Sequence, residues 1–218
     1  MENSKAKELI TDLDKLSEIS ENVDIKKDIN EIRDIILSIK ATMEKNNLIA
    51  LSAPQIGIQK RIFCVKNKKG TYSTFINPMI KKSTNMTFSR EKDECFPDKE
   101  YIYPRSSQIV VNYLTPLNEL KSTNVIGYSA FVFQRMIDHF NGALISDIGL
   151  QIDKQWDNAS EDERSEVLKA YADSLDMLGK QVDKEISDDE ELSKQKKAIE
   201  FEKALIAGEV KFDKKDKD

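Results

Sequence analysis

Residues 133–142 read Phe-Gln-Arg-Met-Ile-Asp-His-Phe-Asn-Gly and resemble a metal-binding helix that lacks one ligand. In a His-Glu-x-x-His helix, positions i and i+4 share a face, so two imidazoles reach one Zn²⁺ or Fe²⁺ while the glutamate moves a proton. Here the three positions hold Arg135, Met136 and His139, so a permanent cation replaces one ligand and a thioether replaces the acid/base. His139 is the only histidine of the chain, and no second imidazole can substitute.

The composition predicts a globular chain of 218 residues, long enough for one good core and an appendage. A net charge of -5 argues against a general nucleic-acid binder, which normally presents a basic face. Residues 1–8 lack the apolar stretch of a signal peptide, and no apolar run is long enough for a membrane helix. We therefore expect no membrane association and a cytoplasmic location, or incorporation into a virion assembled in the cytoplasm. Two cysteines, Cys64 and Cys95, do not make a disulfide scaffold.

Hydrophobic periodicity changes from helical to strand-like and back along the chain. Residues 1–20 are expected to form an N-terminal helix with Leu9, Leu13 and Leu16 on one face, and isoleucines from Ile25 to Ile39 predict a second helix. The middle carries short apolar runs typical of strands, namely Arg61–Val65, Thr74–Ile76, Met86–Phe88 and Gln108–Tyr113. A helix over Tyr128–Asn141 follows, with Gly142 as its C-terminal stop.

Two capping boxes, Ser160 with Glu163 and Ser187 with Glu190, predict a helical hairpin over residues 151–210, followed by a charged tail at 211–218. The apolar stripes of the hairpin need a partner surface, either on their own domain or on another copy or protein. Trp156 lies at the junction and is expected to anchor the hairpin to the domain.

Three segments, in this order, resemble motifs of the peptide deformylases, metalloenzymes that remove the formyl group from new bacterial polypeptides. Residues 48–58, Leu-Ile-Ala-Leu-Ser-Ala-Pro-Gln-Ile-Gly-Ile, are similar to Gly-x-Gly-x-Ala-Ala-x-Gln with both leading glycines replaced. Residues 93–97, Asp-Glu-Cys-Phe-Pro, are similar to Glu-Gly-Cys-Leu-Ser, and the helix at Arg135–His139 is similar to Gln-His-Glu-x-Asp-His-Leu-x-Gly. The resemblance extends over residues 15–148.

The resemblance implies an α+β fold in which small mixed β-sheets pack around a central helix. We expect this deformylase-like domain over residues 21–150, with the N-terminal helix at 1–20 and the C-terminal helical hairpin at 151–210 as additions.

The resemblance also implies roles for single residues. In the family, a cysteine thiolate and two imidazoles hold the metal, a glutamate transfers the proton, and a glutamine side chain and a backbone N–H stabilise the oxyanion. Gln55 and the backbone of Phe96 match the oxyanion donors, and Cys95 and His139 match two ligands. Arg135 and Met136 match the third ligand and the acid/base, and neither can perform that role.

We therefore expect an inactive pocket, with no catalytic residue, metal or cofactor, formed by Gln55, Glu94, Cys95, Phe96, Arg135, Met136 and His139. Our hypothesis is that the guanidinium of Arg135 takes the vacated metal position, with its charge met by Glu94, Asp93 or a Cys95 thiolate. Met136 is then core filling, and His139 a hydrogen-bonded core histidine.

The sequence thus predicts a catalytically inactive deformylase-like protein with a structural or assembly role, in contact with other protein subunits or copies of itself. One version of this role is a bacteriophage virion component. An alternative is an atypical deformylase that acts on N-formylmethionyl peptides, with Fe²⁺ or Zn²⁺ held by Cys95, His139 and a carboxylate. A second alternative is a protein that binds formylated peptide termini through Gln55 and Phe96 without cleaving them.

Overall fold

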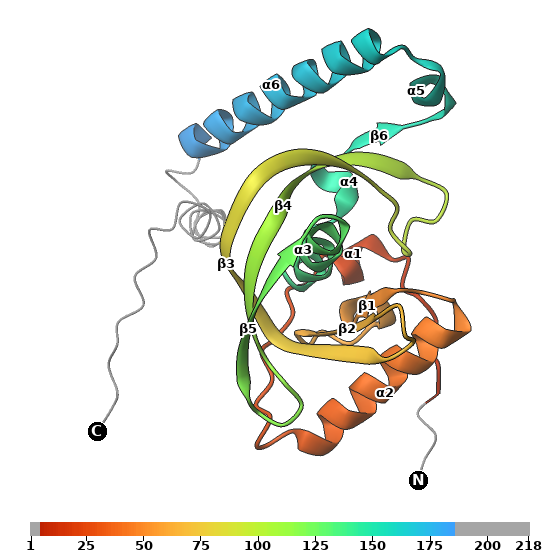
Figure 1. Cartoon of the computed structure of the whole chain (residues 1–218), viewed down its shortest axis with the longest axis vertical. Coiled ribbons are helices and arrows are strands. Elements are labelled where there is room, and N and C mark those ends of the chain that lie inside the picture. The colour runs from red at the N-terminus through yellow and green to blue at the C-terminus, as the bar shows by residue number, and fades with distance from the viewer. Residues whose placement is uncertain (1–4, 186–218) are drawn as a thin grey trace.

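The computed structural model describes residues 5–185, and its centre is one antiparallel sheet (Figure 1). Strands β1 to β5 are hydrogen-bonded in sequence order, and β6 pairs with β4. Their bounds are β1 Ala50–Ser52, β2 Ile62–Lys66, β3 Tyr72–Glu91, β4 Glu100–Leu114, β5 Leu120–Ile126 and β6 Leu150–Ile152. The α+β class is confirmed, and the strands join a single sheet in place of the several small ones expected.

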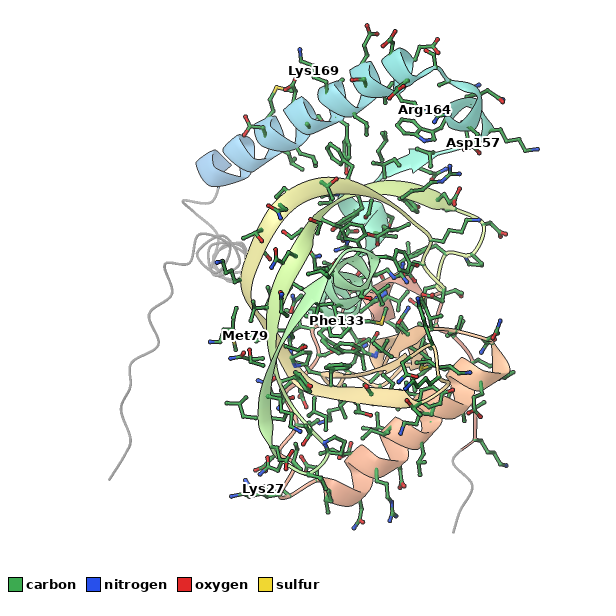
Figure 2. The ribbon with its side chains drawn as sticks, viewed as in Figure 1. Lys27, Met79, Phe133, Asp157, Arg164 and Lys169 are labelled. Carbon is green, nitrogen blue, oxygen red and sulfur yellow. The ribbon has the colours of Figure 1, made fainter. Side chains whose placement is uncertain are left out.

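The curved sheet wraps around helix α3, Tyr128–Phe140, as the sequence predicts for a central helix (Figure 1). Phe63 and Phe75 stack at 4.7 Å between ring centroids, and Phe133 contacts both rings edge-on. Figure 2 shows Phe133 on α3. Helix α2, Ile29–Lys45, covers a second core with Ile32, Ile36 and Ile39, three members of the predicted isoleucine stripe. Two apolar clusters therefore fix α2 and α3 on the sheet.

Strand β3 is far longer than the two separate strands expected at Thr74–Ile76 and Met86–Phe88. Its pairing with β4 shifts register between Ile76 and Met79 and again between Ile80 and Lys82. Such irregularities let a long strand bend, whereas a regular alternation pattern is lost across them. The strand is therefore continuous although its sequence pattern is broken.

The helix expected over residues 1–20 is wrong in extent over the part that the structure describes, because α1, Leu13–Leu16, is the only helix within residues 5–20. The preceding residues make tertiary contacts instead: the backbone N–H of Lys7 donates to Thr42 Oγ1 at 2.9 Å, and that of Ile10 donates to the Gln55 carbonyl at 2.9 Å. Tertiary hydrogen bonds have overridden a modest helical propensity. Gly142 ends α3 as predicted, with φ of 68°, and the carbonyl of Ser17 leaves no room for a Cβ there.

Two short elements complete the domain, the 3₁₀ turn Pro54–Ile56 and helix α4, Ile145–Ile148. The described residues then end with helices α5, Lys154–Asn158, and α6, Glu161–Glu185. The capping box of Ser160 and Glu163 is confirmed, with a backbone N–H of Ser160 donating to Glu163 at 2.7 Å. The hydroxyl of Tyr171 donates to the Ile148 carbonyl at 2.6 Å, so α6 packs on its own domain. The second predicted helix, with Ser187 and Glu190, lies outside the described residues.

No helix within residues 5–185 has the length and apolar character to cross a bilayer.

Candidate functional site

Helix α3 is held at a fixed rotation on β4 by Gln134. The Gln134 amide donates to the Ser106 carbonyl at 2.8 Å, and its oxygen accepts from the Ser106 N–H at 3.0 Å. Arg135 and His139, one helical turn apart, therefore face the loop that leaves β3 and carries Cys95.

The guanidinium of Arg135 is buried, with 5% of the residue exposed, and it points into this loop. Nη1 donates to the Lys92 carbonyl at 2.7 Å, Nη2 lies 3.5 Å from Glu94 Oε1, and Nε lies 3.9 Å from Asp93 Oδ2. Its charge is therefore met by two of the carboxylates that the sequence hypothesis names.

His139 is almost fully buried, and its Nε2 lies 2.8 Å from Asp93 Oδ2. The other oxygen of Asp93 accepts from the backbone N–H of Cys95 at 2.8 Å. Within residues 5–185, Nδ1 of His139 makes no hydrogen bond. One nitrogen of the imidazole is therefore paired with a carboxylate, and the other is buried without a hydrogen-bond partner among the described residues.

The surroundings of His139 shift the pKa values of Asp93 and Cys95 in opposite directions. Burial alone would raise the pKa of Asp93, but the charge and hydrogen bond of His139, followed by the charge of Arg135, hold that pKa well below its usual value. Burial raises the pKa of the Cys95 thiol far above its ordinary range, and the Asp93 carboxylate raises it further. At neutral pH the site therefore holds an aspartate and a protonated thiol, so the sulfur is not the expected thiolate counter-ion.

A second buried arginine, Arg105 of β4, extends the ionic cluster. Its Nε and Nη2 lie 2.8 and 3.1 Å from the oxygens of Glu91, and its Nη1 pairs with Asp138 of α3. Arg135 Nη1 lies 3.8 Å from the same Glu91, which links the two arginines. Two guanidinium groups are thus surrounded by four carboxylates, those of Glu91, Asp93, Glu94 and Asp138.

The two groups predicted to match oxyanion donors are engaged within the protein. The Gln55 oxygen accepts from the backbone N–H and the hydroxyl of Ser52, both at 3.0 Å, and its amide nitrogen faces Asp93 and Glu94 at 3.4 Å. The backbone N–H of Phe96 donates to the Asp93 carbonyl at 2.9 Å. Neither donor is directed at an open substrate position.

The donor set does not fit a catalytic metal ion. A catalytic Zn²⁺ site needs at least three protein ligands, whereas Nε2 of His139 is hydrogen-bonded to Asp93 and Arg135 brings a positive charge in place of a lone pair. No group of three or more His, Cys, Asp and Glu side chains in the described part of the chain is placed to hold a metal.

The structure brings together five of the seven residues of the predicted pocket, Gln55, Glu94, Cys95, Arg135 and His139. The side chain of Met136 lies in the core around α3, and that of Phe96 packs in the apolar clusters beside Cys95 and Tyr101. Sequence reasoning did not place Glu91, Arg105 and Asp138 in the site. Asp138 carried a signal, because it lies three residues after Arg135 and so near the same helix face. The sequence held no comparable signal for Glu91 and Arg105, because their contact depends on the register of β3 and β4.

Comparisons with known proteins agree on one family. The polypeptide deformylase family model matches residues 7–155. A peptide deformylase of Orientia tsutsugamushi strain Boryong is 31% identical over 147 residues, covering 61% of this chain and 80% of the relative. A Met-Ala-Ser-bound class I type b peptide deformylase from Acinetobacter baumannii is 26% identical, with a TM-score of 0.60, over 66% of this chain and 98% of that one. A probable peptide deformylase from Synechococcus phage S-SSM7 is 28% identical, with a TM-score of 0.59, over 66% and 97%.

Replacing Arg135 by methionine removes the cation while keeping most of the side-chain volume. Glu94 then loses its guanidinium partner and Asp93 keeps His139 and the Cys95 N–H among its remaining partners, so we expect a loss of about 3–5 kcal/mol in the free energy of unfolding. Urea denaturation measures it, with Arg33→Met on the exposed face of α2 as a matched control expected to change stability by less than about 0.5 kcal/mol. A loss no larger than that of the control would contradict the role assigned to Arg135.

Asp93→Asn should change the acid dependence of stability. Because the folded pKa of Asp93 is depressed, its contribution is present above the unfolded pKa of about 3.9 and is lost as pH falls towards the folded value. The variant is expected to be less stable at pH 7 and to lose less further stability between about pH 5 and pH 2. Denaturation midpoints across this range measure the effect, and parallel pH profiles would refute it.

Proposed function

Because the chain belongs to the peptide deformylase family but carries Arg135 and Met136 at the positions of a metal ligand and the acid/base, we propose that it lacks deformylase activity. Its function is then structural: it contributes to an assembly through contacts with other protein subunits or with copies of itself. The observation that carries this proposal is the burial of the Arg135 guanidinium among Asp93, Glu94 and the Lys92 carbonyl.

Each chemical requirement of formyl hydrolysis meets an obstacle in this pocket. The acid/base position holds Met136, which is fully buried in the aromatic core and has no titratable proton. Nε2 of His139 is hydrogen-bonded to Asp93 at 2.8 Å and would have to leave this carboxylate to bind a metal. A metal would have to displace an arginine that is itself held by three groups.

The two alternative functions, an atypical deformylase and a binder of formylated termini, would each require contacts in this pocket to change. An atypical deformylase with Fe²⁺ or Zn²⁺ on Cys95 and His139 would need Asp93 to leave His139 and Arg135 to leave the loop. A binder of formylated termini would need the Gln55 amide and the Phe96 N–H, and both are engaged internally. The contacts favour neither reading over a structural role.

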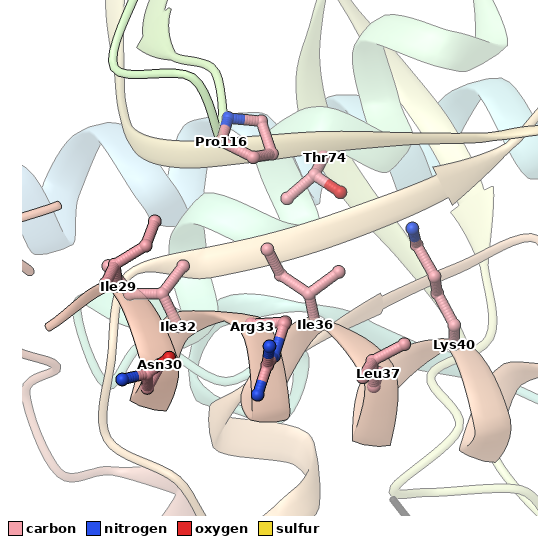
Figure 3. Close-up of a pocket in the computed structure, with 9 residues that line it drawn as sticks. All are labelled: Ile29, Asn30, Ile32, Arg33, Ile36, Leu37, Lys40, Thr74 and Pro116. Atoms are coloured by element: carbon pink, nitrogen blue, oxygen red, sulfur yellow. The ribbon is translucent and has the colours of Figure 1, made fainter. Parts of the chain in front are cut away.

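The surface around α2 supports a role in protein contacts. A groove of about 320 Å³ lies between α2 and the facing residues Thr74 and Pro116 (Figure 3). Ile29 and Leu37 line it from α2 and are 49% and 42% exposed. Next to Pro116, Leu117 is 80% exposed. Apolar side chains gathered in this way are typical of protein interfaces.

In the more specific form of this proposal, the assembly is a phage particle and this chain is a virion component. The fold is found in at least one phage-encoded relative, the probable deformylase of Synechococcus phage S-SSM7. Helices α5 and α6 lie largely beyond the family match at residues 7–155 and add surface to the fold.

The absence of activity has a direct test with its own positive control. Wild type is expected to give no turnover of formyl-Met-Ala-Ser after incubation with Fe²⁺ or Zn²⁺, and calorimetry is expected to show no preference for formylated over unformylated peptide. A triple variant, Glu94→Gly with Arg135→His and Met136→Glu, restores the family residue at each position and should gain metal binding. Stoichiometric metal with turnover in wild type would overturn the proposal, and a formyl-dependent heat would support the binder.

The contact role predicts an effect of the α2 surface on molecular mass. Leu37→Asp combined with Leu117→Asp should abolish association, because charge replaces apolar contact area. Light scattering during gel filtration of material from the native source measures it, with Met79→Asp, at an exposed position on the sheet, as control (Figure 2). A wild-type protein that elutes alone at its 25.0 kDa monomer mass would contradict the role.

A further inference from the structure

The last strand of the sheet, β5, has an unpaired edge. It pairs with β4 on one side, and in the part of the chain that the structure describes no strand pairs with its other side (Figure 1). The opposite end of the sheet is different, because β1 has three residues and all of them are buried. An open edge of seven residues is a template for pairing with a further strand.

The backbone groups along this edge follow from the hydrogen bonds at the two ends of β5. The N–H of Gly127 donates to the Ser107 carbonyl at 2.7 Å, and the N–H of Thr115 donates to the Glu119 carbonyl at 2.9 Å. Both bonds continue the register of the β4–β5 ladder, so the odd-numbered residues of β5 are hydrogen-bonded to β4. The even-numbered residues direct their N–H and C=O groups to the open edge. These are Leu120, Ser122, Asn124 and Ile126.

The residues of β5 include none of the features that usually protect an edge strand. The register with β4 is continuous over all seven residues, so no bulge turns the strand away. The strand contains no proline, and its one charged side chain, Lys121, is paired with Glu119 at 3.0 Å. Both ends of the edge are apolar, since Leu120 and Ile126 are 73% and 65% exposed.

The sequence of β5 complements itself in the antiparallel direction. A pairing centred on Thr123 places Leu120 of one copy opposite Ile126 of the other. The same pairing places Ser122 opposite Asn124, so apolar pairs flank a polar centre. Each of these opposed residues directs its N–H and C=O to the edge, and both groups find a partner in the second copy.

This register also separates like charges and covers the exposed side chains next to β5. Lys121 lies opposite Val125 of the second copy and does not face a second lysine. The turn that carries Leu117 lies towards the start of α3 of the other copy, which carries Tyr128. These two side chains are 80% and 60% exposed in one chain. The fit holds for a second copy of this strand and not for an arbitrary sequence.

We propose that two copies of this chain associate through β5, which forms an antiparallel pair about a two-fold axis at Thr123 and joins the two sheets into one. The inference rests on the contact role proposed above and names a second copy as the partner. Pro116 lines the groove beside α2 and Leu117 follows it, so the two-fold interface is continuous with that surface.

Proline at position 122 tests the pairing, because the N–H of this residue is directed away from β4. Ser122→Pro leaves the bonds to β4 in place and removes a donor from the edge, so the dissociation constant of the dimer should rise by about a hundredfold. Ser122→Ala keeps the N–H and is the matched control, expected to stay at twice the 25.0 kDa mass of one chain. Ile126→Lys, which places a charge on the edge, is a second variant that should dissociate. Light scattering during gel filtration of the purified full-length protein measures the mass, and thermal unfolding verifies the fold of each variant.

A cysteine at the two-fold axis tests the register. The two copies of Thr123 form a pair without hydrogen bonds, with Cα atoms about 4.5 Å apart, a separation that a disulfide can span. Thr123→Cys should therefore give an interchain disulfide under mild oxidation. Ser122→Cys is the control, because its two copies lie diagonally at about 7–8 Å and should not be linked. Cys64 and Cys95 are buried and are common to both variants.

The outcomes distinguish this inference from the contact role on which it rests. A purified wild-type protein of monomer mass would overturn the two-fold pairing, while association with other subunits in native material would leave the contact role in place. A dimer that survives both Ser122→Pro and Ile126→Lys would show that another surface joins the copies and would also overturn the pairing. A dimer in which Thr123→Cys forms no disulfide would contradict the register.

Discussion

The buried charge balance around Arg135 and Arg105 is the constraint on which the rest of the site depends. A guanidinium removed from water is tolerated only with close carboxylate and carbonyl partners. Arg105 reaches Glu91 on β3 and Asp138 on α3, while Arg135 reaches the loop after β3. The two arginines therefore connect the sheet, the central helix and the loop that carries Cys95, and ionic contacts hold together a region where the family has a metal.

The substitutions at this site are mutually consistent in physical terms. Glu94 stands where the family has glycine and faces Arg135, which stands where the family has a ligand. Met136 replaces the acid/base and is fully enclosed by the core around α3. Asp93 couples the loop to His139 and at the same time caps the Cys95 backbone. The contacts of this site are those of a buried salt-bridge cluster, in which each charge has an opposite charge close by.

Sequence periodicity predicted the helices that present one continuous apolar stripe, α2 and α3, and the capping box at Ser160 located the start of α6 within a residue. Periodicity did not predict the structure of segments whose conformation depends on long-range contacts. Residues 5–12 are held by Thr42 and Gln55, so their helical pattern is not realised, and bulged pairing hides the continuity of β3. The position of Arg135 followed from a motif, but its link to Glu91 and Arg105 required the register of two strands.

The most direct test of the account is a crystal of the wild-type protein soaked in Zn²⁺ or Fe²⁺ and measured at the absorption edge of that metal. The account predicts no anomalous peak between Cys95 and His139, with the Arg135 guanidinium hydrogen-bonded to the Lys92 carbonyl. A peak within about 2.3 Å of the Cys95 sulfur, with Arg135 displaced from the loop, would contradict it.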